Sequence, residues 1–291
     1  MVDIPAELVE TQTRYNGAAG RAFIAALPAL AARFHADWAL RPDGPPRYGV
    51  CALVLPVRRA DGTPAVLKLQ LPDGETEGEP LALRAWDGDG AVRLLAHDEA
   101  TGTLLLERLD ATRTLADVPV HEATLVIGRL LARLTARPAP PGLRRLADLA
   151  PALLDRTPPA LARVPDPAAR ALLTDCAAAL REVAAEPGDR LLHWDLHHDN
   201  VLAADRAPWL AIDPKPLSGD PGFDLFPALR DRYDPAGVRW RFDALTDALA
   251  LDRPRARAWT LARVLQTCVW ETEEGMPLTP EHLEIARLLR R

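Results

Sequence analysis

The amino-acid sequence predicts an α+β fold in which a sheet-rich amino-terminal part, residues 1–109, precedes a helical part, residues 110–291. Short β-prone runs separated by turn signals gather before residue 110, and long segments with helical apolar spacing follow it. Neither part contains an internal repeat or a low-complexity tail. A chain of 291 residues is long enough for two lobes that share a cleft.

The amino-terminal part should begin with helical structure, because Leu8, Phe23 and Leu27 belong to an apolar stripe with helical spacing. Pro28 is expected to break this helical region. The Asp61-Gly62 pair is a hairpin signal between two β-prone runs. The elements expected after the first helical region (6–36) are a turn over 41–48, strands over 49–57 and 65–71, a helix over 79–88, and strands over 91–97 and 102–109.

The carboxy-terminal part should be mostly helical. Its clearest helices are expected over 121–137 and 167–186, and residues 222–291 are expected to be largely helical as well. The proline-rich stretches 138–141 and 157–168 are predicted to be loops. Between these helices, a strand and loop over 191–200 and a short hairpin over 201–212 are expected.

Composition narrows the functional class. The hydrophobic content of 48% allows a substantial core, and the net charge of −6 argues against nucleic-acid binding and suits a cationic or neutral small substrate. The three cysteines form no CxxC pair, which is typical of a reducing cytoplasm. No signal peptide or membrane span is evident. We therefore expect a cytoplasmic enzyme that is a monomer or weak dimer.

Lysine and asparagine are unusually rare. Only two lysines, Lys68 and Lys215, and two asparagines, Asn16 and Asn200, occur in the chain. Their codons are A-rich, so a GC-rich genome replaces them wherever arginine or another residue serves equally well. Because lysine is a compact point charge and arginine a planar fork, a surviving lysine can mark a tight phosphate site. Chance survival is the alternative explanation.

The segment His193-Trp-Asp195-Leu-His-His-Asp-Asn200 is the strongest candidate for chemistry, and Asp213 follows at the end of an apolar strand. If the intervening hairpin is centred between Arg206 and Ala207, Asn200 and Asp213 face each other about 5 Å apart. An amide oxygen and a carboxylate would then suit Mg²⁺. Asp195 could orient a substrate hydroxyl and accept its proton, and His193 could hold the loop in shape.

This spacing resembles the kinase catalytic loop H-x-D-x-x-x-x-N followed by a metal-binding aspartate. It is more similar to the aminoglycoside phosphotransferases, whose loop reads HGDLHxxN, and within them to the streptomycin 6-phosphotransferase and hydroxyurea phosphotransferase branch. The segments that carry the resemblance are LLHWDLHHDNVL (191–202), WLAIDPKPLSGDPGFDL (209–225), VLPVRRADGTPAVLKL (54–69) and LLLERL (104–109). The resemblance implies a protein-kinase-like two-lobe fold, a five-stranded antiparallel sheet in the smaller lobe, and ATP bound between the lobes.

The resemblance also assigns roles. It implies that Asp195 is the catalytic base, that Asn200 and Asp213 bind Mg²⁺, and that Lys68 contacts the α- and β-phosphates of ATP. Further positions follow by the same resemblance: Glu79 as the partner of Lys68, with Glu75 and Glu77 as rivals; the backbone from Glu107 to Leu109 as the adenine-binding hinge; and Asp224 as a structural aspartate beneath the catalytic loop.

Two features depart from protein kinases. No G-x-G-x-x-G precedes Lys68, and the Asp-Phe-Gly motif is replaced by Asp213-Pro214-Lys215. Proline fixes φ and makes a flip of this segment less favourable. Lys215 could neutralise charge developing on the γ-phosphate, or it could simply form a surface salt bridge.

Several alternatives stay open at this point. The histidines at 193, 197 and 198 superficially match a metallohydrolase cluster, but such an enzyme has no use for Lys68 in a strand. A nucleotide-binding protein without catalysis is a second alternative. The acceptor implied by the resemblance is a streptomycin-type antibiotic, with hydroxyurea or another small metabolite as rivals. Glu271 and Glu274 could line a pocket for a cationic antibiotic or belong to a solvated acidic turn.

Overall fold

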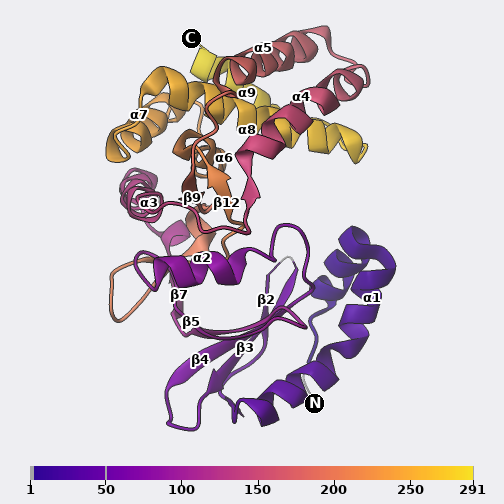
Figure 1. Ribbon diagram of the computed structural model, residues 1–291, viewed down its shortest axis with the longest axis vertical. Coiled ribbons are helices and arrows are strands. Elements are labelled where there is room, and N and C mark those ends of the chain that lie inside the picture. Colours follow the sequence, from indigo (N-terminus) through magenta and orange to yellow (C-terminus); the bar gives the residue numbers. More distant parts are fainter. Residues whose placement is uncertain (1–2, 50, 291) are drawn as a thin grey trace. The chain divides into compact units, whose positions relative to one another are not determined.

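A computed structural model describes residues 3–49 and 51–290, and it divides into two compact units. Unit 1 contains the residues up to Gly88 together with Val92–Leu109, and unit 2 contains Asp89–Ala91 and the chain from Asp110 onward. Figure 1 shows strands concentrated in unit 1 and helices in unit 2. No helix in the described part of the chain combines the length and the apolar character that a membrane span requires.

Unit 1 is an antiparallel sheet between two helices. Its elements are α1 (Ala6–Asp37), β1 (Arg41–Pro42), β2 (Arg47–Tyr48), β3 (Ala52–Arg58), β4 (Pro64–Gln70), α2 (Glu79–Trp86), β5 (Leu94–Asp98) and β6 (Thr103–Glu107). The sheet order is β1-β3-β4-β6-β5, with β2 also paired to β3, so the sheet has six strands rather than five. The additional strands β1 and β2 lie in the segment expected to be only a turn. Val50, within the strand expected over 49–57, lies outside the described residues.

The alternating direction of side chains along β4 determines the position of Lys68, the first candidate site residue. Leu67 and Leu69 are fully buried in a core with Leu27 and Phe34 of α1. Successive side chains of a strand point to opposite faces of the sheet. Lys68 therefore lies on the other face, where α2 is found (Figure 1).

The first helix bends at a different residue from the one expected. The predicted break at Pro28 is wrong, because Pro28 lies inside α1 and the non-helical backbone angles occur at Gly17 (φ 53°, ψ −122°). Glycine has no Cβ and adopts positive φ without steric cost, which explains why the bend is found there. The buried side chains of Leu27, Ala31 and Phe34 flank Pro28 and keep this part of the helix against the sheet.

Unit 2 is predominantly helical. Its elements are β7 (Asp110–Thr114), a 3₁₀ helix (Leu115–Asp117), α3 (Val120–Leu134), β8 (Arg144–Arg145), α4 (Leu146–Leu161), α5 (Pro167–Val183), β9 (Arg190–Leu192), a 3₁₀ helix (His198–Asn200), β10 (Val201–Ala203), β11 (Leu210–Ala211), β12 (Leu217–Gly219), a 3₁₀ helix (Pro221–Asp224), α6 (Phe226–Arg230), α7 (Val238–Ala248), α8 (Arg253–Glu273) and α9 (Pro280–Arg290). Strands β11-β10-β7 and β8-β12-β9 form two small sheets that carry the connecting loops.

Helix α4 corrects the loop expected over 157–168. The helix continues through Pro158 and Pro159 to Leu161, and only the remainder of that stretch is a connection before α5. The buried side chains of α4 recur with helical spacing: Leu146, Ala150, Leu153, Thr157 and Ala160. Burial of this face offsets the hydrogen bonds that proline cannot make.

Candidate active site

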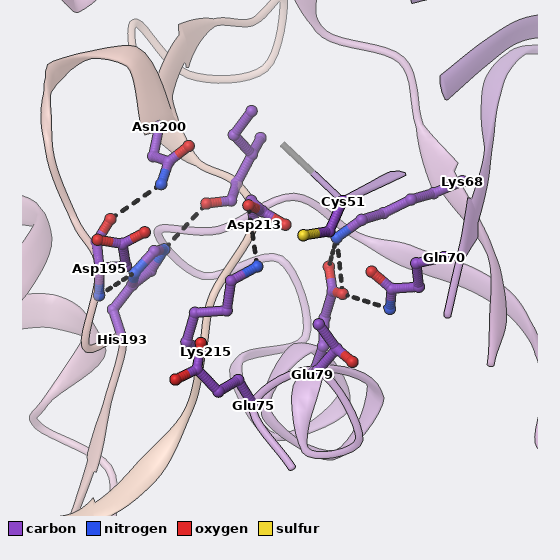
Figure 2. Close-up of polar contacts among 12 residues, drawn as sticks. Cys51, Lys68, Gln70, Glu75, Glu79, His193, Asp195, Asn200, Asp213 and Lys215 are labelled. Atoms are coloured by element: carbon purple, nitrogen blue, oxygen red, sulfur yellow. Dashed lines mark hydrogen bonds and ion pairs between the residues drawn. The ribbon is translucent and has the colours of Figure 1, made fainter. Parts of the chain in front are cut away.

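The Lys68–Glu79 pair is the candidate site of unit 1. The Lys68 Nζ atom lies 2.8 Å from Oε1 and 2.7 Å from Oε2 of Glu79, and Gln70 Nε2 donates to Oε2 at 2.9 Å (Figure 2). The Lys68 side chain is 7% exposed and the Glu79 side chain is completely buried. Glu75 and Glu77, the other acidic candidates, lie in the turn that precedes α2. A buried ammonium held by two carboxylate oxygens has a fixed direction.

The expected hinge residues lie at the end of β6. Glu107 is tied to the neighbouring chain, because its Oε1 accepts from Arg93 N at 2.9 Å and its own N–H donates to Arg93 O at 3.0 Å. Leu109 is the last residue of unit 1. Within the described residues no hydrogen bond engages the Leu109 backbone, so its N–H and C=O can pair with another molecule.

In unit 2 the loop between β9 and β10 carries the sequence motif, and several bonds fix its shape (Figure 2). Asp195 N donates to His193 Nδ1 at 3.4 Å, and Asn200 Nδ2 donates to the Asp195 carbonyl at 2.9 Å. The amide nitrogen of Asn200 is thus used inside the loop. Its oxygen is directed elsewhere and can serve as a ligand for a hard cation.

The segment after β11 is joined to this loop by three hydrogen bonds. Ile212 N donates to Asn200 O at 2.9 Å, His193 Nε2 lies 3.0 Å from Ile212 O, and Lys215 N donates to His193 O at 3.0 Å. Because Nδ1 accepts from Asp195 and Nε2 faces a carbonyl, His193 fits as the neutral Nε2–H tautomer. Burial lowers the pKa of His193 to about 3, so the ring is a neutral link between two loops.

The hairpin register differs from the expected one by one residue. Val201 pairs with Ala211 and Leu202 with Leu210, which places Ile212, not Asp213, opposite Asn200. The expected direct pairing of Asn200 with Asp213 is therefore wrong. Asp213 follows with a left-handed backbone (φ 55°), and the side chains of Asn200 and Asp213 nevertheless lie in the same part of the unit (Figure 2).

Lys215 contacts Asp213 directly. The Lys215 Nζ atom is 3.1 Å from Asp213 Oδ2, with 19% and 36% of the two side chains exposed. The ammonium therefore lies beside the carboxylate that is predicted from the sequence to be a metal ligand. This position is compatible both with a salt bridge and with contact to a bound phosphate.

Asp224 supports the loop from beneath. Its completely buried carboxyl group accepts hydrogen bonds from His193 N at 2.8 Å and from Trp194 N at 2.6 Å. Burial raises the pKa of Asp224 to about 7 although both bonds favour the ionised form. The two bonds fix the backbone just before Asp195.

The acidic residues expected at the carboxy-terminal patch have different environments. Glu271 is buried, accepts from Thr279 N at 3.2 Å, and lies 3.1 Å from His282 Nδ1. Burial would raise the pKa of Glu271, but the neighbouring His282 ring and the hydrogen bonds from Thr279 outweigh it and lower the pKa. Glu271 thus supports residues of a pocket wall from behind, and Glu274 is exposed at the end of α8.

A pocket with a volume of about 420 Å³ lies within unit 2, and Thr279 and His282, the two neighbours of Glu271, are among its lining residues. Three acidic residues, Asp199, Asp231 and Glu281, contribute to its walls. The remaining lining residues are His197, Arg230, Tyr233, Thr279 and His282. Arg230 also reaches the loop between β9 and β10, where its guanidinium lies 3.3 Å from Asp195 Oδ1. This one side chain therefore both lines the pocket and contacts Asp195.

The model of the aminoglycoside/hydroxyurea antibiotic resistance kinase family matches residues 37–275. The chain belongs to this family. A hydroxyurea phosphotransferase of Kitasatospora aureofaciens is 60% identical over 97% of this chain and 84% of its own length. A streptomycin 6-kinase of Streptomyces glaucescens is 53% identical over 100% of this chain and 98% of its own length.

Solved structures of the same architecture show that this member of the family has a kinase-like fold. A putative fructosamine-3-kinase from Thermobifida fusca has a TM-score of 0.62 at 21% identity, covering 90% of this chain and 98% of that one. A macrolide 2′-phosphotransferase from Brachybacterium faecium has a TM-score of 0.58 at 21% identity, covering 91% and 97%. These structures show the fold, while the family and the relatives above make the chain a phosphotransferase, an enzyme class that uses a nucleoside triphosphate and a divalent metal.

Proposed function

We propose that this enzyme transfers the γ-phosphoryl group of ATP to a hydroxyl group of streptomycin. The observation that carries the proposal is that Asp195, the candidate base, contacts Arg230, which lines a pocket with acidic walls. Streptomycin carries guanidinium groups, and carboxylates recognise such groups through paired charged hydrogen bonds. The family and the full-length similarity to a streptomycin 6-kinase support the same acceptor.

The size of the pocket also favours a large acceptor. Sites for drug-sized ligands commonly measure about 300–1,000 Å³, and this pocket measures about 420 Å³. Hydroxyurea has only a few heavy atoms and would leave most of that volume to water. An aminoglycoside ring with its cationic substituents would fill it and neutralise Asp199, Asp231 and Glu281.

We assign the chemistry of the acceptor to Asp195. Its carboxylate would orient the acceptor hydroxyl and receive its proton as the new P–O bond forms and the bond to ADP breaks. Asn200 and Asp213 are proposed to hold Mg²⁺, which would neutralise charge on the phosphates. Lys215, beside Asp213, is proposed to add a positive charge for the transferred group. His193, neutral and buried, keeps both loops in place.

Unit 1 is proposed to supply nucleotide binding. Lys68, aimed by Glu79, would contact the α- and β-phosphates. The backbone of Leu109 would pair with adenine, while Glu107 holds the adjacent strand end through Arg93. This division gives each unit a distinct substrate to bind.

Streptomycin phosphorylation is the direct test. Purified enzyme with ATP and Mg²⁺ is expected to add one phosphoryl group to streptomycin, detected by mass spectrometry, and the modified hydroxyl can be located by NMR. Hydroxyurea and a neutral sugar serve as comparison acceptors in parallel reactions. If streptomycin stays unmodified while hydroxyurea gains phosphate, the assigned acceptor is wrong.

Hydroxyurea is the second candidate because the hydroxyurea phosphotransferase relative has the higher identity of the two, 60% against 53%. The two acceptors make different demands on the pocket. A Glu281→Gln variant should raise KM for streptomycin, since a carboxylate is lost from the wall, and should leave KM for hydroxyurea unchanged.

Replacing Lys68 by arginine should weaken nucleotide binding even though the charge is kept. The ammonium fits between two carboxylate oxygens in a site that is 7% exposed, and a planar guanidinium cannot reproduce that geometry. KM for ATP is expected to rise about tenfold, equivalent to about 1.4 kcal/mol, while KM for the acceptor stays the same. Equal ATP affinity of both proteins by calorimetry would contradict the assignment.

A further inference from the structure

Arg230 contacts the candidate base through one of its two carboxylate oxygens. It is the last residue of α6, and its Nη2 lies 3.3 Å from Asp195 Oδ1. No hydrogen bond within the described residues reaches Asp195 Oδ2. The side chains of Arg230 and Asp195 are 37% and 24% exposed, and Arg230 also lines the pocket of unit 2. One oxygen is thus restrained and the other is available to an acceptor.

The next residue holds the same loop at a second point. The Asp231 carboxylate accepts from His198 N at 2.9 Å and lies 2.6 Å from His198 Nδ1. Burial would raise the pKa of Asp231, but hydrogen bonds from His198 outweigh it and hold the pKa well below its usual range. Arg230 therefore contacts the loop at Asp195, and Asp231 contacts it at His198, three residues further along the chain.

A buried arginine fixes the chain from which these two side chains extend. Arg241 of α7 is 1% exposed, and its guanidinium donates to Asp231 O at 2.8 Å, to Arg232 O at 3.2 Å and to Ala228 O. These carbonyls lie at the end of α6, where the helix leaves acceptors without internal partners. The backbone from which the Arg230 side chain extends is consequently held in place.

We propose that Arg230 is a positioning residue for phosphoryl transfer. It holds Asp195 by Oδ1 so that Oδ2 faces the acceptor hydroxyl, and it places a positive charge beside the carboxylate. The proton of the hydroxyl passes to Oδ2 as the oxygen bonds to the γ-phosphorus and ADP departs. This inference rests on the proposed function, because it takes Asp195 to be the base.

The test compares Arg230→Met, which removes the charge, with Arg230→Lys, which keeps it. Arg129→Met on the exposed face of α3 is the matched control. Arg230→Met is expected to lower kcat about 10- to 100-fold, the scale of a misplaced catalytic group, with KM for ATP unchanged. Arg230→Lys should keep most of the rate, added guanidinium ion should restore part of the Arg230→Met rate, and Arg129→Met should match the unaltered enzyme.

Unchanged kcat in Arg230→Met, or equal losses in the methionine and lysine variants, would overturn the proposal. A second measurement needs no turnover. Crystal structures of the unaltered enzyme and Arg230→Met should show the Asp195 carboxylate in different rotamers or orientations, and an identical carboxylate in both would also overturn it. If the unaltered enzyme modifies no acceptor, the proposed function fails, and the crystal comparison still decides the role of Arg230.

Discussion

Replacing Asp195 by alanine is expected to lower kcat for phosphoryl transfer by about 10²- to 10⁴-fold, the usual contribution of a general base. Nucleotide binding should be largely kept, because the Lys68–Glu79 pair that is proposed to hold the nucleotide belongs to the other unit. The rate is measured with saturating ATP and acceptor, and ATP affinity is measured by calorimetry.

Two comparisons sharpen this experiment. Asp195→Asn keeps the shape of the side chain and removes its basicity, so it should lose about as much activity as the alanine variant. Asp205→Ala, an exposed aspartate in the turn between β10 and β11, should behave like the unaltered enzyme. Transfer at the original rate in Asp195→Ala would show that another group accepts the proton.

Replacing Asp224 by alanine is expected to destabilise unit 2 by about 2–6 kcal/mol, because two buried backbone N–H groups, those of His193 and Trp194, lose their acceptor. Each unsatisfied buried donor costs about 1–3 kcal/mol. Chemical denaturation followed by fluorescence measures the free energy of unfolding.

Asp224→Asn separates charge from hydrogen bonding. An amide offers one oxygen to one N–H and turns its own NH₂ toward the other, so this variant should also be destabilised, by less than the alanine variant. The exposed Asp205→Ala again serves as the control and should change the stability by less than about 0.5 kcal/mol. A loss in Asp224→Ala no larger than that of the control would show that the loop is held by other contacts.

The order of elements could be predicted because apolar spacing and turn signals are local, and the kinase-like fold was implied by the resemblance of the motifs to a known family. The predictions that were wrong concern positions where the local backbone preference of a residue competes with the burial of apolar side chains. Proline rules predicted a break at Pro28 and a loop at Pro158, and in both cases a buried helical face keeps the helix intact. The register of the β10–β11 hairpin depends on the turn geometry at 203–209, which residue types alone did not determine.

The candidate site was partly predictable, because some of its residues belong to a local sequence motif and others do not. Asp195, Asn200 and Asp213 belong to a motif with fixed spacing, so they could be predicted as site residues from the sequence. Arg230 and Asp231 belong to no such motif, and only the path of the chain at the end of α6 brings them to the loop between β9 and β10. An arginine next to an aspartate is common in this arginine-rich chain, so no sequence signal distinguished this pair.

The conformation of Trp194 has a consequence for how such a loop can evolve. Its φ of 68° is one that bulky residues rarely adopt, at a cost of about 1–2 kcal/mol. The indole is buried, and the guanidinium groups of Arg144 and Arg263 lie 4.3 and 4.7 Å from its ring centre. Attraction between the two cations and the ring can offset the cost of the strained backbone. A glycine in place of this tryptophan would relieve the strain but would also remove the ring against which the two arginines lie.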